Sequence, residues 1–533
     1  MFDVLIVGGE VLDGSGAPAR RADVGIAGGR IAAIGNLARE AGQETIAAEG
    51  RIVAPGFIDM HAHDDFNLPV NPVQPGKVLQ GVTTVVVGNC GFSPAPIVPD
   101  RRKLAEELWS FLDSGLDSNY STFAEFLARL PPSGPNVAPL VGHLSVRVAA
   151  MGADDRPPTP SELERMCAFV DEAMRAGTFG LSTGLVYPPA CYAKTDEIVA
   201  VAGVAARRGG GYFTHMRNEG DGILDSIRET AEIGRHSGAP VQISHLKVTN
   251  KANWGRAKEV LDAIDLLRAQ GVTLHADQYP YTAASTGLKT LLPQWAHDGG
   301  APALVARLQD PAIRTRLRDE MLASMGNGST RISSWDDALV SFSPSQPDWG
   351  GLSLTAVGQR LNRHPVEALF DVLIADRAST LGIFFSIGED DLRLILRHPA
   401  VAIGSDGIFL GVPDKPDRSR PHPRYFGTFP RILGRYTREE GVLTLPQAVH
   451  KMTGLSARIL GLKDRGLLRV GMAADAVVFD PRTVADTATY AEPNQQPSGI
   501  DAAIVNGIVT VRGGQLSGSI GGKLLRRAGP VGK

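Results

Sequence analysis

The stretch Ile52-Val-Ala-Pro-Gly-Phe-Ile-Asp-Met-His-Ala-His63 places two histidines directly behind a short apolar run. Residues i and i+2 of an extended segment face the same way, so both imidazoles can point to one place at the end of a strand over residues 52–58. Two polar residues in a loop are the alternative interpretation for an isolated pair. The rest of the chain decides between them, because a parallel barrel gathers its functional side chains at the carboxyl ends of its strands.

Further short apolar runs follow along the middle of the chain and alternate with segments of helical periodicity. One such segment, residues 160–176, has Thr159 as N-cap, a proline at its first position and Glu162 at its third. Eight strands are the number that a closed (β/α)8 barrel needs. The expected strands cover residues 52–58, 82–87, 137–141, 179–181, 211–213, 241–243, 272–274 and 401–403.

Both ends of the chain carry strand and turn signals. Gly28-Gly29 and Asn506-Gly507 supply the positive φ that two-residue hairpin turns require, and residues 4–7 before Gly8-Gly9 indicate another hairpin. Neither end alone offers enough core for a domain, so we expect one small β-sandwich built from both.

The predicted architecture is therefore an α/β protein: a (β/α)8 TIM-like barrel with a small β domain from both termini and an inserted lid. The lid is expected because the stretch between the seventh and eighth strands is far longer than an ordinary connection. The predicted boundaries are 1–54 and 461–533 for the small β domain, 55–283 and 349–460 for the barrel, and 284–348 for the lid.

Composition excludes several classes of protein. The 533 residues include 54 basic and 57 acidic side chains, and this near balance argues against a nucleic-acid-binding surface. The three cysteines cannot form a disulfide scaffold and favour the cytosol. No signal peptide and no run of about 18 apolar residues is present. We expect a cytoplasmic protein with a small-molecule substrate and no nucleic-acid or membrane partner, and a homo-oligomer is left open.

Three further soft or borderline metal ligands stand at strand ends. Cys90 follows the second expected strand, and His215 and His245 end the fifth and sixth. Taken singly, each is more often a buried structural residue. Together with His61 and His63 they form a set of five at the same end of four strands, which favours a metal site.

Asp406 ends the eighth expected strand in Ala402-Ile-Gly-Ser-Asp-Gly407. A carboxylate there can act as general base toward a metal-activated water. An Asp that caps a turn before a glycine is the alternative. The neighbouring ligand set favours the catalytic role.

These residues resemble the amidohydrolase superfamily, and longer strings are similar to its N-acyl-D-amino-acid deacylase (D-aminoacylase) family. The resemblance spans essentially the whole chain and rests on several strings together. They are Gly88-Asn-Cys-Gly-Phe-Ser-Pro-Ala-Pro96, Gly180-Leu-Ser-Thr-Gly-Leu-Val-Tyr-Pro188, Thr214-His-Met-Arg-Asn-Glu219, Asp277-Gln-Tyr-Pro-Tyr-Thr-Ala283 and Pro421-His-Pro-Arg-Tyr-Phe-Gly-Thr-Phe-Pro430.

The resemblance implies zinc-dependent hydrolysis of N-acyl-D-amino acids to a carboxylate and a free D-amino acid, with Asp406 as general acid/base. It implies one tightly bound Zn2+ and a second, weaker metal site. The implied ligands are Cys90, His215 and His245 for the first ion, and His61 and His63, sharing the cysteine, for the second.

The resemblance also implies that Arg424 and Lys247 bind the substrate's α-carboxylate and that Tyr279 lies near the scissile amide. Solvated surface charge is the alternative for the two cations, and core packing is the alternative for the tyrosine. From their positions at strand ends, Tyr187 and His143 are expected to line the mouth of the site.

Two other functions remain open at this level. One is an amidohydrolase acting on another amide: a D-dipeptide, a cyclic imide or a hydrophobic acyl-amide. The other is a non-enzymatic scaffold, which would show eroded metal positions, whereas the expected ligands are all present. The fourth strand has neither Lys nor Glu, which disfavours a hydantoinase with a carbamylated lysine.

Overall fold

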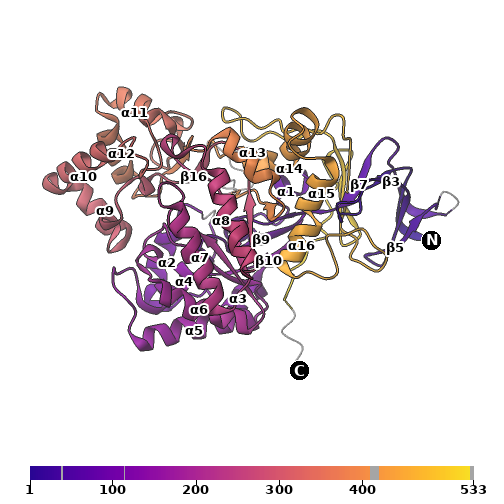
Figure 1. Cartoon of the computed structure of the whole chain (residues 1–533), viewed down its shortest axis with the longest axis horizontal. Coiled ribbons are helices and arrows are strands. Elements are labelled where there is room, and N and C mark those ends of the chain that lie inside the picture. Colours follow the sequence, from indigo (N-terminus) through magenta and orange to yellow (C-terminus); the bar gives the residue numbers. More distant parts are fainter. Residues whose placement is uncertain (38–39, 113–114, 408–418, 528–533) are drawn as a thin grey trace.

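The computed structural model describes residues 1–37, 40–112, 115–407 and 419–527. Figure 1 shows an elongated molecule in which one group of helices lies at one end of the long axis and a group of strands lies at the other. The helices at the first end are α9 (Gly300–Gln309), α10 (Pro311–Ser324), α11 (Leu354–Leu361) and α12 (Pro365–Ala375). The strands at the other end belong to segments close to the two termini.

Parallel strands form the middle of the molecule and pair in chain order. Two sheets contain them, β10-β9-β8 and β11-β12-β13-β14-β15-β19, and only Leu140 separates β10 from β11. The strands are β8 (Phe57–Asp59), β9 (Val82–Val87), β10 (Asn136–Pro139), β11 (Val141–Gly142), β12 (Gly180–Gly184), β13 (Gly211–His215), β14 (Val241–Ile243), β15 (Leu274–Gln278) and β19 (Val401–Ile403).

The last parallel strand returns to the first. The amide of Met60 donates to the carbonyl of Ile403 at 3.2 Å, and the amide of Asp406 donates to the carbonyl of His61 at 2.7 Å. Helices follow most of these strands: α4 (His143–Met151), α5 (Pro160–Arg175), α6 (Thr195–Arg207), α7 (Ile223–Ser237), α8 (Ala257–Ala269), α13 (Glu389–Arg397), α15 (Leu445–Met452) and α16 (Gly454–Leu460). The carboxyl ends of β8 and β19 are therefore neighbours.

Several of the expected strands differ from the structure. The run 137–141 is divided between β10 and β11, which belong to different sheets, and the strand expected at 179–181 is β12, from Gly180 to Gly184. The run 52–58 is two strands, since β7 (Ile52–Pro55) pairs in a terminal sheet and only β8 joins the parallel strands. The break falls at Gly56, where a Cβ would lie 2.2 Å from the Thr83 side chain. The seventh strand begins at Leu274 instead of 272 and continues to Gln278, because its neighbour β14 pairs with it from Val241↔Leu274 onward.

Both termini build the sheets at the far end. One sheet has the order β23-β22-β21-β20-β7-β2-β3 and the other the order β5-β4-β1-β6. Their strands are β1 (Phe2–Val7), β2 (Glu10–Val11), β3 (Arg20–Arg21), β4 (Asp23–Ala27), β5 (Arg30–Gly35), β6 (Gly42–Ala47), β20 (Ala476–Phe479), β21 (Ile500–Val505), β22 (Ile508–Arg512) and β23 (Gln515–Leu516), together with β7. One hydrophobic cluster joins them, with Ile6, Val24, Ala476 and Ile504 fully buried.

The hairpins expected at Gly28-Gly29 and Asn506-Gly507 are confirmed as β4–β5 and β21–β22, with positive φ at all four turn residues. The hairpin expected at Gly8-Gly9 is wrong. There β1 and β2 enter different sheets, because β1 pairs with β4 and β6 whereas β2 pairs with β3 (Arg20–Arg21) and β7.

The stretch between β15 and β19 holds a separate hydrophobic cluster. It contains the antiparallel sheet β16-β18-β17, made of β16 (Ala284–Gly287), β17 (Ala338–Phe342) and β18 (Leu381–Phe384), together with α9 to α12. The expected lid ended at residue 348, whereas this cluster continues to Phe384. The physical reason is β18, which pairs with both β16 and β17 and so ties residues 349–384 to the same core.

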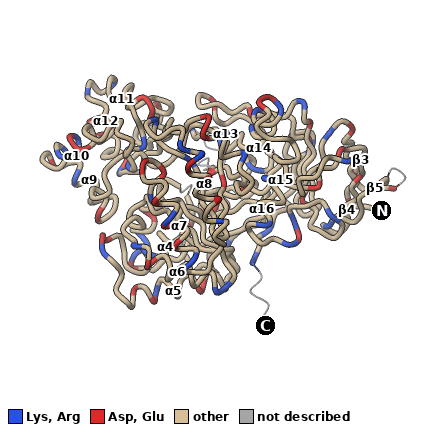
Figure 2. Tube along the Cα trace, viewed as in Figure 1, with Lys and Arg blue, Asp and Glu red and all other residues tan. Residues whose placement is uncertain are grey.

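The segment before residue 527 crosses the amino-terminal side of the parallel strands. Val137 N donates to Lys523 O, Leu525 N donates to Val137 O, and the Leu525 side chain is buried in a cluster that includes Phe179 and Phe213. Within the described residues, none of the helices combines the length and apolarity needed to span a bilayer. Figure 2 shows acidic and basic residues interspersed along the whole trace.

Candidate metal centre

The expected ligands meet at the carboxyl ends of the parallel strands. His61 and His63 follow β8, Cys90 follows β9, and Asp406 follows β19. His215 is the last residue of β13, and His245 stands two residues after β14. Because adjacent parallel strands end at the same edge, these residues converge although the chain separates them widely. All six are buried, with side chains no more than about a tenth exposed.

The Cys90 thiol is the centre of the first group. Its Sγ lies 3.3 Å from His61 Nε2, 3.3 Å from His245 Nε2 and 3.8 Å from His215 Nδ1. In a tetrahedral zinc site with bonds of 2.0–2.3 Å, sulfur and nitrogen ligands are about 3.5 Å apart. The spacing of the described donor atoms therefore fits one zinc ion between them.

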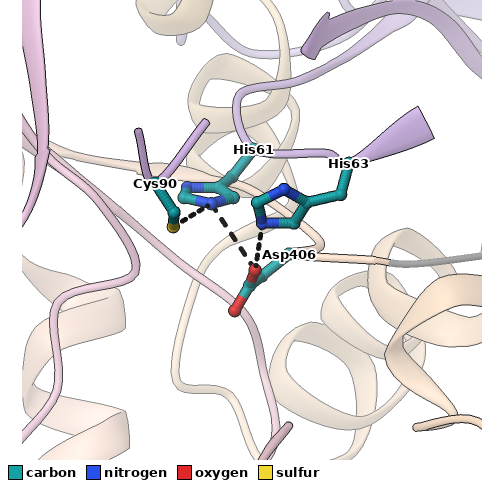
Figure 3. Close-up of side chains that lie close together, drawn as sticks. All are labelled: His61, His63, Cys90 and Asp406. Carbon is teal, nitrogen blue, oxygen red and sulfur yellow. Dashed lines mark hydrogen bonds and ion pairs between the residues drawn. The ribbon is translucent and has the colours of Figure 1, made fainter. Parts of the chain in front are cut away.

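Asp406 organises a second group beside the first. Its Oδ1 lies 3.2 Å from His63 Nε2 and 3.5 Å from His61 Nε2. Figure 3 shows both imidazoles turned toward this carboxylate, with the Cys90 sulfur on the other side of His61. The ligand atoms of His61, His63, Cys90 and Asp406 all lie within 4.8 Å of one another. Two potential metal positions therefore share Cys90.

The backbone is strained where three of these side chains are attached. Cys90, His245 and Asp406 have φ values of 54°, 37° and 50°. Side chains other than glycine rarely adopt this region, and each such residue costs on the order of 1–3 kcal/mol. The conformation turns each side chain inward directly after its strand.

Protonation states support a site for a cation. Burial lowers the pKa of His215 and His245 well below the usual value, so both imidazoles are neutral, as metal ligands must be. Burial, then the charge of Asp406, raises the pKa of the Cys90 thiol. A divalent cation among these donors is what would favour the thiolate, so the donor set fits zinc chemically as well as geometrically.

Asp406 is ionised in this environment. Burial alone would raise its pKa, but the charges of Arg424 and then His61 hold that pKa well below the usual range. The guanidinium Nη1 of Arg424 lies 2.8 Å from Asp406 Oδ2. The two carboxylate oxygens therefore face different groups, with Oδ1 toward the histidines and Oδ2 toward the arginine.

Two outer carboxylates support the histidines and were not singled out from the sequence. Glu219 Oε2 lies 3.4 Å from His215 Nε2, and its Oε1 lies 3.2 Å from His245 Nδ1. Asp277 Oδ1 lies 3.4 Å from His61 Nδ1 and accepts from the His245 amide at 2.9 Å. Carboxylates in such positions fix the ring orientation of metal-binding histidines. The available signal was that both residues stand in the strings on which the family resemblance rests.

The residues expected to hold the substrate's carboxylate lie beside Asp406. Arg424 covers the ring of Tyr279 at 4.7 Å, and Lys247 Nζ lies 5.8 Å from the same ring. The Tyr279 hydroxyl is buried without a hydrogen-bond partner among the described residues. Lys247 donates to Glu219 at 2.6 Å. Two cations and an unpaired hydroxyl are thus gathered at one side of the centre.

The two residues expected at the mouth differ in their surroundings. The Tyr187 ring meets His215 edge-on, with ring centroids 5.0 Å apart, and its hydroxyl accepts from Thr286 at 3.2 Å. His143 is fully buried and its Nε2 lies 2.9 Å from Glu197 on α6, which also pairs with Arg147. Within the described residues, the His143 imidazole therefore pairs with a helix residue and not with the metal ligands.

A cavity of about 320 Å³ borders the centre on the side of the inserted cluster. His215 and Glu219 form part of its wall, and Thr290, Gln294 and Arg331 from the insertion form another part. Arg331 Nη1 lies 3.9 Å from Glu219 Oε2. Arg331 is a further residue that sequence reasoning missed, because it stands in an irregular segment without strand or helix periodicity.

Residues 44–511 match the model of the Amidohydrolase family. The chain is similar to the D-aminoacylase of Alcaligenes xylosoxydans xylosoxydans, with 39% identity over 99% of this chain and 98% of that protein.

Two solved structures are similar over almost the full length. One is a D-aminoacylase studied for its binuclear metal centre, with a TM-score of 0.83 and 37% identity, covering 99% of this chain and 100% of the other. The second is N-acyl-D-glutamate deacylase from Bordetella bronchiseptica, complexed with zinc and a phosphonate mimic of the tetrahedral intermediate. It has a TM-score of 0.83 and 37% identity, covering 98% of this chain and 99% of the other.

Proposed function

The chain belongs to the amidohydrolase family, and from this premise we propose that it hydrolyses the amide bond of N-acyl-D-amino acids to a carboxylate and a free D-amino acid. The observation that carries the proposal is the convergence of Cys90, His215 and His245 beside Asp406, next to the cations Arg424 and Lys247. The similarity to D-aminoacylase over nearly the whole chain supports the same substrate class.

Cys90, His215 and His245 would hold one zinc ion tightly, and His61 and His63 would hold a second, weaker one that shares Cys90. When bound, zinc supplies a Lewis acid that polarises the acyl carbonyl and lowers the pKa of water toward about 7. Glu219 and Asp277 would hold the proton of each imidazole on the ring nitrogen that faces away from the metal, and would fix the orientation of the ring.

Asp406 is proposed as the general acid/base. Its Oδ1, on the side of the histidines, accepts the proton of the attacking water and later delivers it to the departing amine. Arg424 now lies against Oδ2 and favours the ionised carboxylate. When the substrate's α-carboxylate draws the guanidinium toward itself, this stabilisation weakens and Asp406 becomes a stronger proton acceptor.

Arg424, Lys247 and Tyr279 are proposed to bind the α-carboxylate and the atoms beside the amide. An arginine can bind a carboxylate through two parallel hydrogen bonds, which fixes its plane as well as its position. With the carboxylate held there and the amide at the metal ligands, only one hand of the α-carbon directs its side chain into the cavity near Arg331. Tyr187 would contact the acyl group from the other side of His215, and His143 would act only through Glu197.

The fold proposed to carry this site is a single (β/α)8 barrel, and the Met60–Ile403 hydrogen bond supports its closure. The two terminal sheets would form the small β-sandwich domain. We place the inserted lid at residues 284–384 instead of 284–348, on the basis of its shared core. The cavity wall contributed by this lid makes it the part of the chain that sets side-chain preference.

A stereo-resolved hydrolysis screen tests the function. Zinc-loaded protein is offered paired N-acetyl-D- and N-acetyl-L-amino acids, a D-dipeptide and a hydantoin, and the released amine is measured. We expect turnover of the D-acyl substrates with little for their L-partners. A preference for L-substrates, or for the hydantoin or dipeptide, would contradict the proposal.

A further inference from the structure

A second, smaller cavity lies behind Tyr187. Its walls are the aromatic rings of Phe92, Phe111 and Tyr187 together with the side chain of Lys289. The cavity has a volume of about 20 Å³, which leaves room for only a small group. Pro188, Thr290 and His297 line both this cavity and the larger one, so the two adjoin.

Lys289 is an unpaired cation in this wall. Its side chain is partly buried and its Nζ lies 5.5 Å from the centre of the Phe111 ring. Among the described residues, no carboxylate or carbonyl lies within hydrogen-bond or ion-pair distance of that nitrogen.

Three lysines are fully buried in the part of the chain that the structure describes, and each has a partner. Lys77 donates to Asp59 at 2.7 Å, Lys247 donates to Glu219 at 2.6 Å, and Lys451 donates to the carbonyl of Val401 at 2.8 Å. A charge removed from water without a partner is costly. Lys289 differs from these three lysines because it is partly exposed in the cavity wall and has no partner among the described residues, so an anion can reach it from outside.

The wall of this small cavity carries a positive charge. Burial lowers the pKa of Lys289 to about 8, so its ammonium group is still mostly charged at neutral pH. Burial, and then the charge of Lys289, lowers the pKa of His297 to about 4, so this neighbour is neutral. The wall thus presents one uncompensated positive charge surrounded by aromatic rings.

The cavity is connected to the metal ligands through Tyr187. The Tyr187 ring meets His215 on one side, and its hydroxyl accepts from Thr286, which lies three residues before Lys289. Thr286 and Lys289 line the same small cavity. A substrate with its amide at His215 can therefore extend a short chain past Tyr187 toward the ammonium group.

We propose that Lys289 binds a second carboxylate of the substrate, remote from the α-carboxylate, with the aromatic rings enclosing the methylene chain between them. The inference rests on the proposed function. The carboxylate belongs either to an acidic D-side chain or to a dicarboxylic acyl group, since both end in the same anion on an apolar stem. Substrates of this class carry two negative charges.

Two matched substrate pairs show whether the second carboxylate belongs to the D-side chain or to the acyl group. N-acetyl-D-glutamate is compared with N-acetyl-D-norvaline, and N-succinyl-D-leucine with N-butanoyl-D-leucine, so that only the terminal carboxylate differs within a pair. kcat/KM is measured for the wild type, Lys289→Met and Lys289→Arg. Lys258→Met, on the exposed face of α8, is the matched control for loss of one positive charge.

In one of the two pairs, we expect the wild type to prefer the carboxylate substrate by about 10- to 100-fold, the range expected for a hydrogen bond to a charged group. Lys289→Met should abolish this preference without a comparable loss on the neutral partner, whereas Lys289→Arg and Lys258→Met should keep it. The pair that shows the preference identifies the arm of the substrate that reaches the cavity.

A preference that is absent from both pairs, or that survives in Lys289→Met, overturns the role of Lys289 and leaves the deacylase function intact. Failure to hydrolyse any of the four substrates contradicts the deacylase function instead. In that case, calorimetric binding of the same four compounds still tests Lys289. Tighter binding of one carboxylate compound that is lost in Lys289→Met supports the site, and equal binding within both pairs overturns it.

Discussion

At the scale of single residues, the centre depends on backbone that is held in a rarely adopted conformation. Cys90, His245 and Asp406 all have positive φ directly after a strand. The hydrogen bonds of the flanking strands hold them there: the Asp406 amide donates to His61 O, and the His245 amide donates to Asp277. This strain is stored by the fold and aims three side chains at one point.

Asp406 is predicted to be needed for turnover but not for zinc binding. Asp406→Asn removes the proton acceptor while keeping the shape of the side chain. General acid/base groups contribute about 10²–10⁴-fold, so kcat should fall by that factor while zinc content, measured by elemental analysis, stays unchanged. Asp390→Asn, at an almost fully exposed site on α13, is the control. Near-normal turnover with zinc bound would rule out the proposed role.

Cys90 is predicted to be the residue on which metal binding depends most. Its Sγ is shared by both ligand groups, so Cys90→Ala removes a donor from each. Zinc affinity should weaken by more than the roughly 10–100-fold that loss of an outer partner costs, as measured by competition with a chelator. Cys167→Ala, on the partly buried face of α5, should bind zinc normally. Equal affinities in the two variants would contradict the ligand assignment.

The sequence was sufficient to find the candidate ligands, because a residue at the end of a parallel strand has a predictable location. The sequence alone did not identify Glu219, Asp277 and Arg331 as residues of the site. Their roles depend on which ring nitrogen or cavity wall they meet, and this is decided by contacts between segments far apart in the chain. His143 shows the opposite case. Its place directly after β11 predicted that it would line the mouth of the site, but its imidazole pairs with Glu197 on α6.

At the scale of elements, local signals predicted helices better than strand partners. Residues 160–176 were expected as a helix with a capping box, and α5 confirms this to within one residue, with both capping bonds between Thr159 and Glu162 present. The run 52–58 looked like one strand because hydrophobicity does not reveal a change of partner. β7 and β8 belong to different sheets, because β7 pairs with β20 whereas β8 pairs with β9.

The capping box of α5 should make stability depend on pH. Bidentate hydrogen bonds from Arg156 lower the pKa of Glu162 from its usual 4.5 to about 2. Its folded pKa lies below its unfolded pKa, so its stabilisation is present above pH 4.5 and is lost as the pH falls toward 2.

Glu162→Gln should lower the free energy of unfolding at pH 7 by about 1 kcal/mol or less, because the pair is near the surface. Urea denaturation at several pH values should show the difference shrinking as the solution becomes more acidic. Glu164→Gln, exposed on the same helix, is the control and should show no such trend. A difference that is constant with pH would indicate that charge plays no part in the cap.

At the scale of the whole molecule, the hydrophobic core of the inserted stretch continues beyond the boundary that the sequence predicted. The boundary expected at residue 348 falls before α11 and α12. Their side chains pack instead with Leu288 and Val340 in the inserted core. Strand β18 causes this, because it pairs across more than ninety positions with β16. The periodicity of the sequence does not indicate which distant segment a strand pairs with.

Leu525 is predicted to stabilise the molecule far from the site. It is 7% exposed and packs with Phe179 and Phe213 below the parallel strands. Leu525→Ala should reduce the free energy of unfolding by about 2–5 kcal/mol, measured by urea denaturation. Leu516→Ala, where the side chain is 40% exposed, should change it by no more than about 0.5 kcal/mol. A small effect of Leu525→Ala would mean that this segment contributes little to the stability of the parallel strands.

The division of residues 52–59 between β7 and β8 has a consequence for how the protein is made. The segment that carries His61 and His63 is synthesised early, but β8 receives its second neighbour only when Ile403 has been added, and β7 only when Ala476–Phe479 have followed. At about 5–20 residues per second, this delay is on the order of tens of seconds. Throughout that time the nascent chain presents an open strand edge, beside a pair of histidines whose carboxylate neighbour, Asp406, has not yet been made.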